Sequence, residues 1–149
     1  MTYVKIDLDA LDDPSTVVAN AEDLRGIVTD NSQDVVLALE LLEHTEHPDR
    51  ILREMARVCR PDGHLVITVP GKSYPKHEFP VDLWRIGDRT LRQLFEDGHG
   101  FRVLRCETEG SANALFRTLL LVRKERADAE LSTWPQGSLD LQQGLRILP

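Results

Sequence analysis

The 149-residue sequence predicts an α/β protein built around a parallel sheet. The first observation is the apolar run at 34–39, DVVLAL, which is bounded by polar residues as in a strand covered on both faces. The second is the order of the next segments, which are a helical period, a Pro-Asp-Gly turn and another apolar run at 64–70. A strand, a helix and a strand in this order form a right-handed βαβ unit.

Two shorter strands are expected before this unit, at 3–8 and 17–19, and the first alternates apolar with polar residues up to Asp9. We expect 34–39 to be the central strand of the sheet. The helix of the βαβ unit is expected over 48–60, where apolar residues recur at helical spacing: Ile51, Leu52, Met55, Val58 and Cys59.

The later part of the chain is expected to begin with an ordered loop at 71–87, which has two Pro, two Gly and no period. Asp88 is the expected N-cap of a second helix that Gly98 ends. Strands at 101–109 and 114–124 then form an antiparallel pair at the edge of the sheet.

The amphipathic pattern ends at Lys124. We therefore expect one domain over 1–124, and after it a tail or loosely docked extension over 125–149.

Composition excludes several classes of protein. Hydrophobic residues make up 41% of the chain, and no apolar run approaches the roughly 20 residues that a membrane-spanning helix needs. A net charge of −7 with dispersed Lys and Arg argues against a nucleic-acid partner. The first residues do not resemble a signal peptide, and Cys59 and Cys106 lack motif spacing, so we expect a cytoplasmic protein with reduced thiols.

Residues 34–70 closely resemble the middle of the class I S-adenosylmethionine-dependent methyltransferases, of the small-molecule, type 11-like kind. That family has Asp-x-Val, then Glu-His, then a helix, and then Arg-Val-Leu-Arg-Pro-Gly-Gly before a strand that ends in Pro; Asp62 here replaces one Gly. Residues 80–95 resemble the Asp-Tyr-Trp-Arg segment of a bacterial subset often associated with glycan or natural-product pathways. The resemblance covers about 3–123 and implies a Rossmann-like sheet.

The resemblance also implies S-adenosylmethionine as cofactor and S-adenosylhomocysteine as product. Asp7 matches the acidic residue that accepts hydrogen bonds from the ribose hydroxyls, and Asp9 is the alternative. Residues 17–24, VVANAEDL, match the segment that meets the adenine. The further cofactor contacts that the resemblance implies are Asn20, Ala21, Glu22, Leu39 and Glu40.

One departure from the family is large. The family places a strand, a Glu/Asp-x-Gly-x-Gly loop and a helix before the position of Tyr3, and this chain begins at Met1. No Gly-containing stretch elsewhere comes after a strand and opens a helix as that loop does. We therefore expect an N-terminally truncated sheet, whose missing strand comes from a partner chain, a swapped dimer or the segment 125–149 folding back.

Glu43 and His44 are the candidate catalytic residues. They come directly after the strand at 34–39, and parallel sheets present their binding crevices at this end of a strand. Neutral His44 can accept a proton near neutral pH, and the resemblance adds that the pair borders cofactor and substrate. The alternative is that both residues brace the next helix.

The loop at 71–87 supplies the candidate substrate contacts, which are Tyr74, His77, Trp84 and Arg85. Trp84 would stack on the substrate and Arg85 would pair with an acidic group. Alternatively, Trp84 fills the core and Arg85 pairs with Asp82 or Asp88. No metal site is expected, because the other histidines lack ligand spacing: His47, His64 and His99.

The sequence supports two hypotheses of function. The first is S-adenosylmethionine-dependent methyl transfer to a small molecule, with the site completed by a homodimer or a partner chain. The second is a methyltransferase-like scaffold subunit or fragment without catalytic activity.

Overall fold

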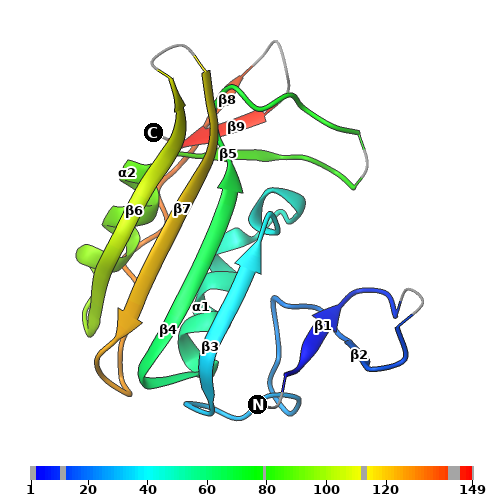
Figure 1. Cartoon of the computed structure of the whole chain (residues 1–149), viewed down its shortest axis with the longest axis vertical. Coiled ribbons are helices and arrows are strands. Elements are labelled where there is room, and N and C mark those ends of the chain that lie inside the picture. The colour runs from blue at the N-terminus through cyan, green and yellow to red at the C-terminus, as the bar shows by residue number, and fades with distance from the viewer. Residues whose placement is uncertain (1–2, 11–12, 79, 112–113, 141–144, 149) are drawn as a thin grey trace.

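The computed structural model describes residues 3–10, 13–78, 80–111, 114–140 and 145–148. Its elements form three separate sheets, and both α-helices lie behind the largest of them (Figure 1). In chain order they are β1 (Lys5–Asp7), β2 (Thr16–Val18), β3 (Gln33–Leu39), η1 (Leu42–His44), α1 (Pro48–Val58), β4 (Cys59–Pro70), β5 (Trp84–Ile86), α2 (Asp88–Glu96), β6 (Phe101–Ser111), β7 (Ala114–Lys124), β8 (Ser138–Asp140) and β9 (Leu145–Leu148).

The largest sheet has the strand order β3-β4-β7-β6 (Figure 1). β3 and β4 are parallel and α1 connects them, so the βαβ unit expected from the sequence is present. β6 and β7 form the expected antiparallel pair, with β6 at the edge of the sheet. The Rossmann-like architecture predicted from the sequence is confirmed in this part of the chain.

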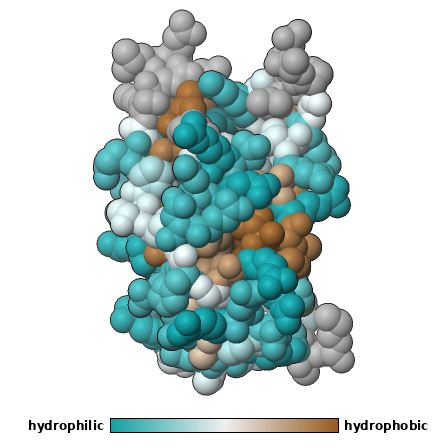
Figure 2. Space-filling view, turned by 90° about the vertical axis from the view of Figure 1, so that its left-hand side faces the viewer, coloured by the Kyte–Doolittle hydropathy of each residue, from teal (hydrophilic) through white to brown (hydrophobic). Residues whose placement is uncertain are grey.

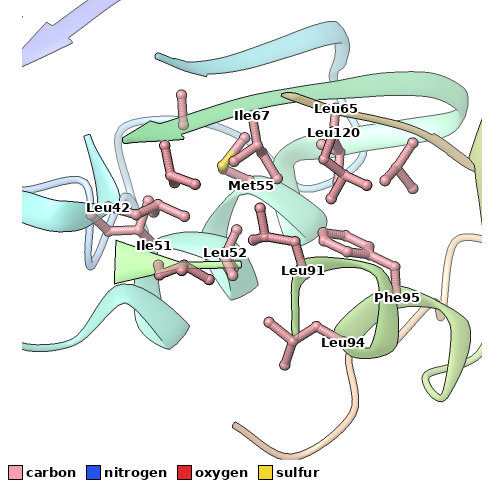
Figure 3. Packing of buried hydrophobic residues seen from close by; sticks show 14 of the residues in the cluster. Leu42, Ile51, Leu52, Met55, Leu65, Ile67, Leu91, Leu94, Phe95 and Leu120 are labelled. Atoms are coloured by element: carbon pink, nitrogen blue, oxygen red, sulfur yellow. The ribbon is translucent and has the colours of Figure 1, made fainter. Parts of the chain in front are cut away.

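The core lies between this sheet and the two helices. Apolar side chains of α1 and α2 point toward the sheet (Figure 3), as their helical period predicts. Leu52, Leu65, Leu91 and Leu120 have no exposed surface at all. Burial of each such side chain contributes about 1.5–3 kcal/mol. α2 begins at Asp88, one residue earlier than expected, because Gly87 rather than Asp88 is its N-cap.

β3 is neither central nor covered on both faces, which corrects the expectation from its apolar run. It lies at an edge of its sheet, and no strand among the described residues pairs with its free side. Val35, Leu37 and Leu39 are 45%, 57% and 56% exposed, because both helices cover the opposite face. Figure 2 views the molecule from the other side, which carries α2 and β6 in Figure 1, and shows further hydrophobic side chains gathered at mid-height.

β1 and β2 form a parallel pair that stands apart from the main sheet, on the side of β3 (Figure 1). A small cluster of Leu24, Val28 and Val58 packs this part of the chain against α1, with Ile6 and Val36 at its margin. Buried polar contacts add to this packing: the amide of Leu24 donates to Glu54 at 2.6 Å. The N-terminal part is therefore attached through α1 rather than through strand pairing.

The segment after Lys124 is more closely packed than expected. β9 pairs in parallel with β5, which itself lies in the segment 71–87 that was expected to be a loop. Leu145 and Leu148 are 1% and 2% exposed. The tail therefore adds to a small third sheet, and β9 does not supply a strand to β3. Within the described residues, no helix is long and apolar enough to span a membrane.

Lys124, the last residue of β7, is buried to 1% exposure. Its ammonium donates to the carbonyl oxygens of Ala56 at 2.7 Å and Cys59 at 2.9 Å, and to Oδ1 of Asn31 at 2.8 Å. The positive charge therefore lies at the C-terminus of α1, where the helix dipole favours it. Burial lowers the pKa of Lys124.

Candidate functional site

The candidate site begins where β3 ends. Glu40 comes directly after the strand with a φ of 51°, in the left-handed region that residues with a side chain seldom adopt. Its amide donates to the carbonyl oxygen and the hydroxyl of Thr68 at 3.0 and 3.1 Å, which holds this conformation against β4. The turn leads directly into η1, which carries Glu43 and His44.

Glu43 is almost fully buried, with 1% of its surface exposed. Its Oε2 has no hydrogen-bond partner among the described residues. Burial raises the pKa of Glu43 to about 7; the carboxylates of Glu40 and Asp82 add to the rise, while a backbone hydrogen bond and Arg85 oppose it. A carboxyl group of this kind exchanges its proton near neutral pH, as an acid or base in catalysis must.

His44 lies against Glu43, with Nε2 at 3.5 Å from Oε1 of the carboxyl. Its other ring nitrogen, Nδ1, is 2.6 Å from the carbonyl oxygen of Val81. Because a carbonyl oxygen can only accept, Nδ1 carries the hydrogen, and the lone pair of the neutral ring is on Nε2. The structure thus brings together the two residues that the sequence singled out as catalytic.

Arg85 and Asp82 form a buried ion pair beside this couple. The two Nη atoms of Arg85 donate to the two carboxylate oxygens of Asp82 at 2.5 and 2.8 Å, and both side chains are at most 1% exposed. Nδ1 of His77 lies 3.0 Å from Oδ2 of the same carboxylate. The sequence indicated Asp82 only as an alternative partner of Arg85, and its position three residues before Arg85 was the signal for it.

The substrate candidates of the segment 71–87 divide into buried and exposed residues. Trp84 is 4% exposed, and its Nε1 donates to the carbonyl oxygen of Thr45 at 2.8 Å. Its ring meets Trp134 edge to face at 5.9 Å. Trp84 and Arg85 therefore have the packed positions that the sequence left open as the alternative. Tyr74, at 41% exposure, is accessible.

The segment expected to meet the adenine lies next to the Glu43–His44 pair. Oδ1 of Asn20 accepts the amide of Glu22 at 2.9 Å, and the Glu22 carboxylate accepts the hydroxyl of Thr45. Ala21 packs against the main core. Thr45, which sequence reasoning missed, therefore joins this segment to His44.

Asp7 is the last residue of β1, as expected from the sequence, and its side chain is half-buried. Its carboxylate makes one long contact among those described, with the amide of Asp9 at 3.5 Å. Leu39 is exposed and Glu40 accepts from Arg117 at 3.1 Å. No group of three or more metal-ligating side chains occurs within the described part of the chain.

The raised pKa of Glu43 predicts a pH dependence of stability. Below pH 4.5, its ordinary pKa, the group is protonated in both states. Between pH 4.5 and about 7 the folded protein holds a proton that the unfolded chain has lost, so wild-type stability falls as pH rises. Glu43→Gln lacks this titration. Between pH 4.5 and about 7 we therefore expect its free energy of unfolding to rise by roughly 2–3 kcal/mol relative to that of wild type.

Urea denaturation of both proteins at several pH values measures this difference. Glu46→Gln is the matched control, because Glu46 is exposed. Parallel stability curves for wild type and Glu43→Gln would show that Glu43 keeps an ordinary pKa.

Comparison with known proteins bears on the family and the fold of the chain. The family model described as a methyltransferase domain matches residues 3–67. Comparison with curated proteins gives no match.

Several solved structures share the fold. The 1,6-didemethyltoxoflavin-N1-methyltransferase of Burkholderia thailandensis, solved with its 1,6-didemethyltoxoflavin and S-adenosylhomocysteine, is 18% identical with a TM-score of 0.60, over 81% of this chain and 60% of that one. A chain of the complex between the Haloferax volcanii Trm112 methyltransferase activator and a methyltransferase is 18% identical with a TM-score of 0.58, over 77% and 64%. A 4+2 cyclase is 21% identical with a TM-score of 0.54, over 74% and 55%.

The chain thus spans less than two thirds of the length of each of these structures. Their low identity establishes a shared fold, and the cyclase shows that this fold carries more than one chemistry. By sequence over residues 3–67 and by fold over most of its length, the chain is similar to the class I S-adenosylmethionine-dependent methyltransferases.

Proposed function

We propose that this protein binds S-adenosylmethionine and directs methyl transfer to a small-molecule acceptor in the cytoplasm. The observation that carries the proposal is the contact of the buried Glu43 with His44 at the end of β3, with the Asn20–Glu22 segment joined to this pair through Thr45. The family match over residues 3–67 supports the same cofactor. The structure from Burkholderia thailandensis, which shares the fold, holds a small molecule, 1,6-didemethyltoxoflavin. The resemblance of the segment 80–95 favours an acceptor from a glycan or natural-product pathway.

The cofactor would supply an electrophilic methyl group on a positively charged sulfur. In this proposal Asp7 accepts hydrogen bonds from the ribose hydroxyls, because its carboxylate ends β1 and has oxygens to spare. The adenine would lie against the segment of Asn20, Ala21 and Glu22, and Leu39 and Glu40 would line the cofactor from the end of β3. His44 would accept a proton through Nε2, and Glu43 would share it, since its pKa of about 7 permits either state.

On the substrate side, Tyr74 and His77 would contact the acceptor, while Trp84 and Arg85 would support this wall from behind. Positioning supplies much of the rate in such a transfer. The buried contacts of Trp84 and Arg85 therefore contribute by fixing the loop.

The proposed site is completed by a second chain. The free side of β3 and the exposed Val35, Leu37 and Leu39 are a surface on which another strand can pair and pack. A second copy of this chain or a partner protein would supply that strand, and a neighbour in fold was solved in a complex with an activator. The same surface favours the alternative, a scaffold subunit that uses the fold for assembly alone.

Calorimetric titration with S-adenosylhomocysteine tests the proposal. We expect saturable binding, weakened at least tenfold in Asp7→Ala because this carboxylate would lose two hydrogen bonds to the ribose. Asp9→Ala is the matched control and should change the Kd by less than about twofold.

Light scattering on the same samples gives the oligomeric state in which binding occurs. Absence of binding in every oligomeric state would refute cofactor binding and favour the scaffold. A larger effect of Asp9→Ala than of Asp7→Ala would assign the ribose to Asp9.

A further inference from the structure

A second histidine lies beside the Glu43–His44 pair, on the loop between β4 and β5. The imidazoles of His44 and His77 meet edge to face, with their centroids 5.1 Å apart. The side chain of His77 is 34% exposed, whereas that of Asp82 behind it is completely buried. His77 thus reaches solvent at one end and a buried carboxylate at the other.

The contacts of Asp82 determine which nitrogen of His77 carries hydrogen. Although burial raises it, the pKa of Asp82 lies below its ordinary value, because Arg85 and the amide of His77 donate hydrogen bonds to the carboxylate. An ionised carboxylate can only accept, so Nδ1 of His77, at 3.0 Å, is the donor. The lone pair of the neutral ring is then on Nε2, at the end of the ring away from Asp82.

The contacts of the Asp82 carboxylate fix its orientation toward His77. Arg85 holds both of its oxygens, at 2.5 and 2.8 Å, and the amide of His77 donates to Oδ2 at 3.2 Å. Arg85 is fixed in turn by the carbonyl oxygens of Tyr74, Pro75 and Trp84. Arg85 and Asp82 make more contacts than their ion pair alone requires. Together these contacts fix the orientation of the half-exposed imidazole of His77.

We propose that Nε2 of His77, rather than Nε2 of His44, accepts the proton of a hydroxyl or amino group on the methyl acceptor, with Asp82 and Arg85 as positioning residues. Nε2 of His44 faces the buried Glu43 at 3.5 Å, whereas the His77 side chain is 34% exposed. The inference rests on the proposed function. In the transfer, the acceptor oxygen or nitrogen forms a bond to the methyl carbon. The carbon–sulfur bond of the donor breaks and leaves its electron pair on sulfur, and the acceptor proton passes to Nε2 of His77.

The charges around His77 also define the class of acceptor. Its neighbours in the cluster are His44, Glu43, Asp82 and Arg85, with Glu40 close to Glu43. Arg85 is the only cation in this described cluster, and Asp82 already neutralises it. A carboxylate or phosphate would therefore find no free positive charge there, whereas a neutral hydroxyl or amine would find two imidazole acceptors. The geometry selects a neutral hydrogen-bond donor.

Nitrogen NMR of the ¹⁵N-labelled wild-type protein tests which ring nitrogen of His77 carries the hydrogen. We expect His77 to be in the Nδ1–H form when neutral, whereas the exposed His47 should show a mixture of tautomers in the same spectrum. Addition of 4-fluorophenol should shift the Nε2 signal of His77, and 4-fluorobenzoate should not.

Fluorine NMR titration with 4-fluorophenol tests whether Nε2 of His77 binds a neutral hydroxyl group. His77→Gln should raise the Kd of the phenol about fivefold or more, the effect of one lost hydrogen bond, and His47→Gln should leave it unchanged. The inference is overturned if His77 carries its hydrogen on Nε2, if the phenol leaves Nε2 unmoved, or if the benzoate binds as well as the phenol. The phenol and tautomer results can agree with the inference while wild type fails to bind S-adenosylhomocysteine. In that case the proposed function is overturned, and His77 is still assigned as a proton acceptor for neutral donors.

Discussion

Arg85→Met should lower the free energy of unfolding by about 3–5 kcal/mol, because it leaves the Asp82 carboxylate charged and buried without its partner. The Asp82 side chain has no exposed surface and receives both Nη atoms of Arg85. Urea denaturation monitored by tryptophan fluorescence measures the loss, since Trp84 adjoins the pair in sequence and is itself buried.

Two controls separate the buried charge from the loss of a long side chain. Arg92→Met removes an exposed arginine that pairs with Glu96, and should cost less than about 1 kcal/mol. The double variant Arg85→Met/Asp82→Leu should recover most of the stability, since apolar replacement of a whole buried pair is often nearly neutral. A single-variant loss below about 1.5 kcal/mol would mean that water reaches Asp82 in solution.

Lys124→Met should cost about 2–4 kcal/mol. Methionine fills about the same space but removes three charge-assisted hydrogen bonds, two of them to the carbonyl oxygens of Ala56 and Cys59. It also removes the positive charge from the C-terminus of α1. Thermal and urea denaturation both measure the change.

Lys72→Met is the matched control, because Lys72 is exposed and should tolerate the same substitution within about 0.5 kcal/mol. Amide hydrogen exchange gives a second measure, since protection should fall first in the last turn of α1. Equal stability of Lys124→Met and Lys72→Met would show that the ammonium contributes nothing to the fold.

The elements with a clear period could be predicted from the sequence. The helix near 48–60 and the parallel strands on either side of it are evident from apolar spacing, because each buries one face against its neighbours. The position of Glu43 and His44 directly after a strand could be predicted in the same way, while their catalytic role stays a prediction.

Three features could not be predicted in this way. The apolar run of β3 is the same whether its outer face is covered or bare, because a strand's composition does not record what packs on it. β5 and β9 are three and four residues long and pair through their backbones, so neither shows a period. His77 and Asp82 meet through the path of a loop, for which the sequence contained only the spacing of Asp82 from Arg85.

The attachment of β1 and β2 bears on how tightly any nucleoside could be held. Each strand has three residues and, within the described ranges, pairs only with the other. Such a two-stranded unit is marginal without the packing of Leu24, Val28 and Val58. Local opening of this unit therefore requires far less free energy than global unfolding. Since Asp7 lies on it, the measured affinity for a ribose would equal the intrinsic affinity reduced by the fraction of molecules in which β1 is docked. A chain that covered the free side of β3 would raise that fraction, and would strengthen nucleoside binding without touching the ligand.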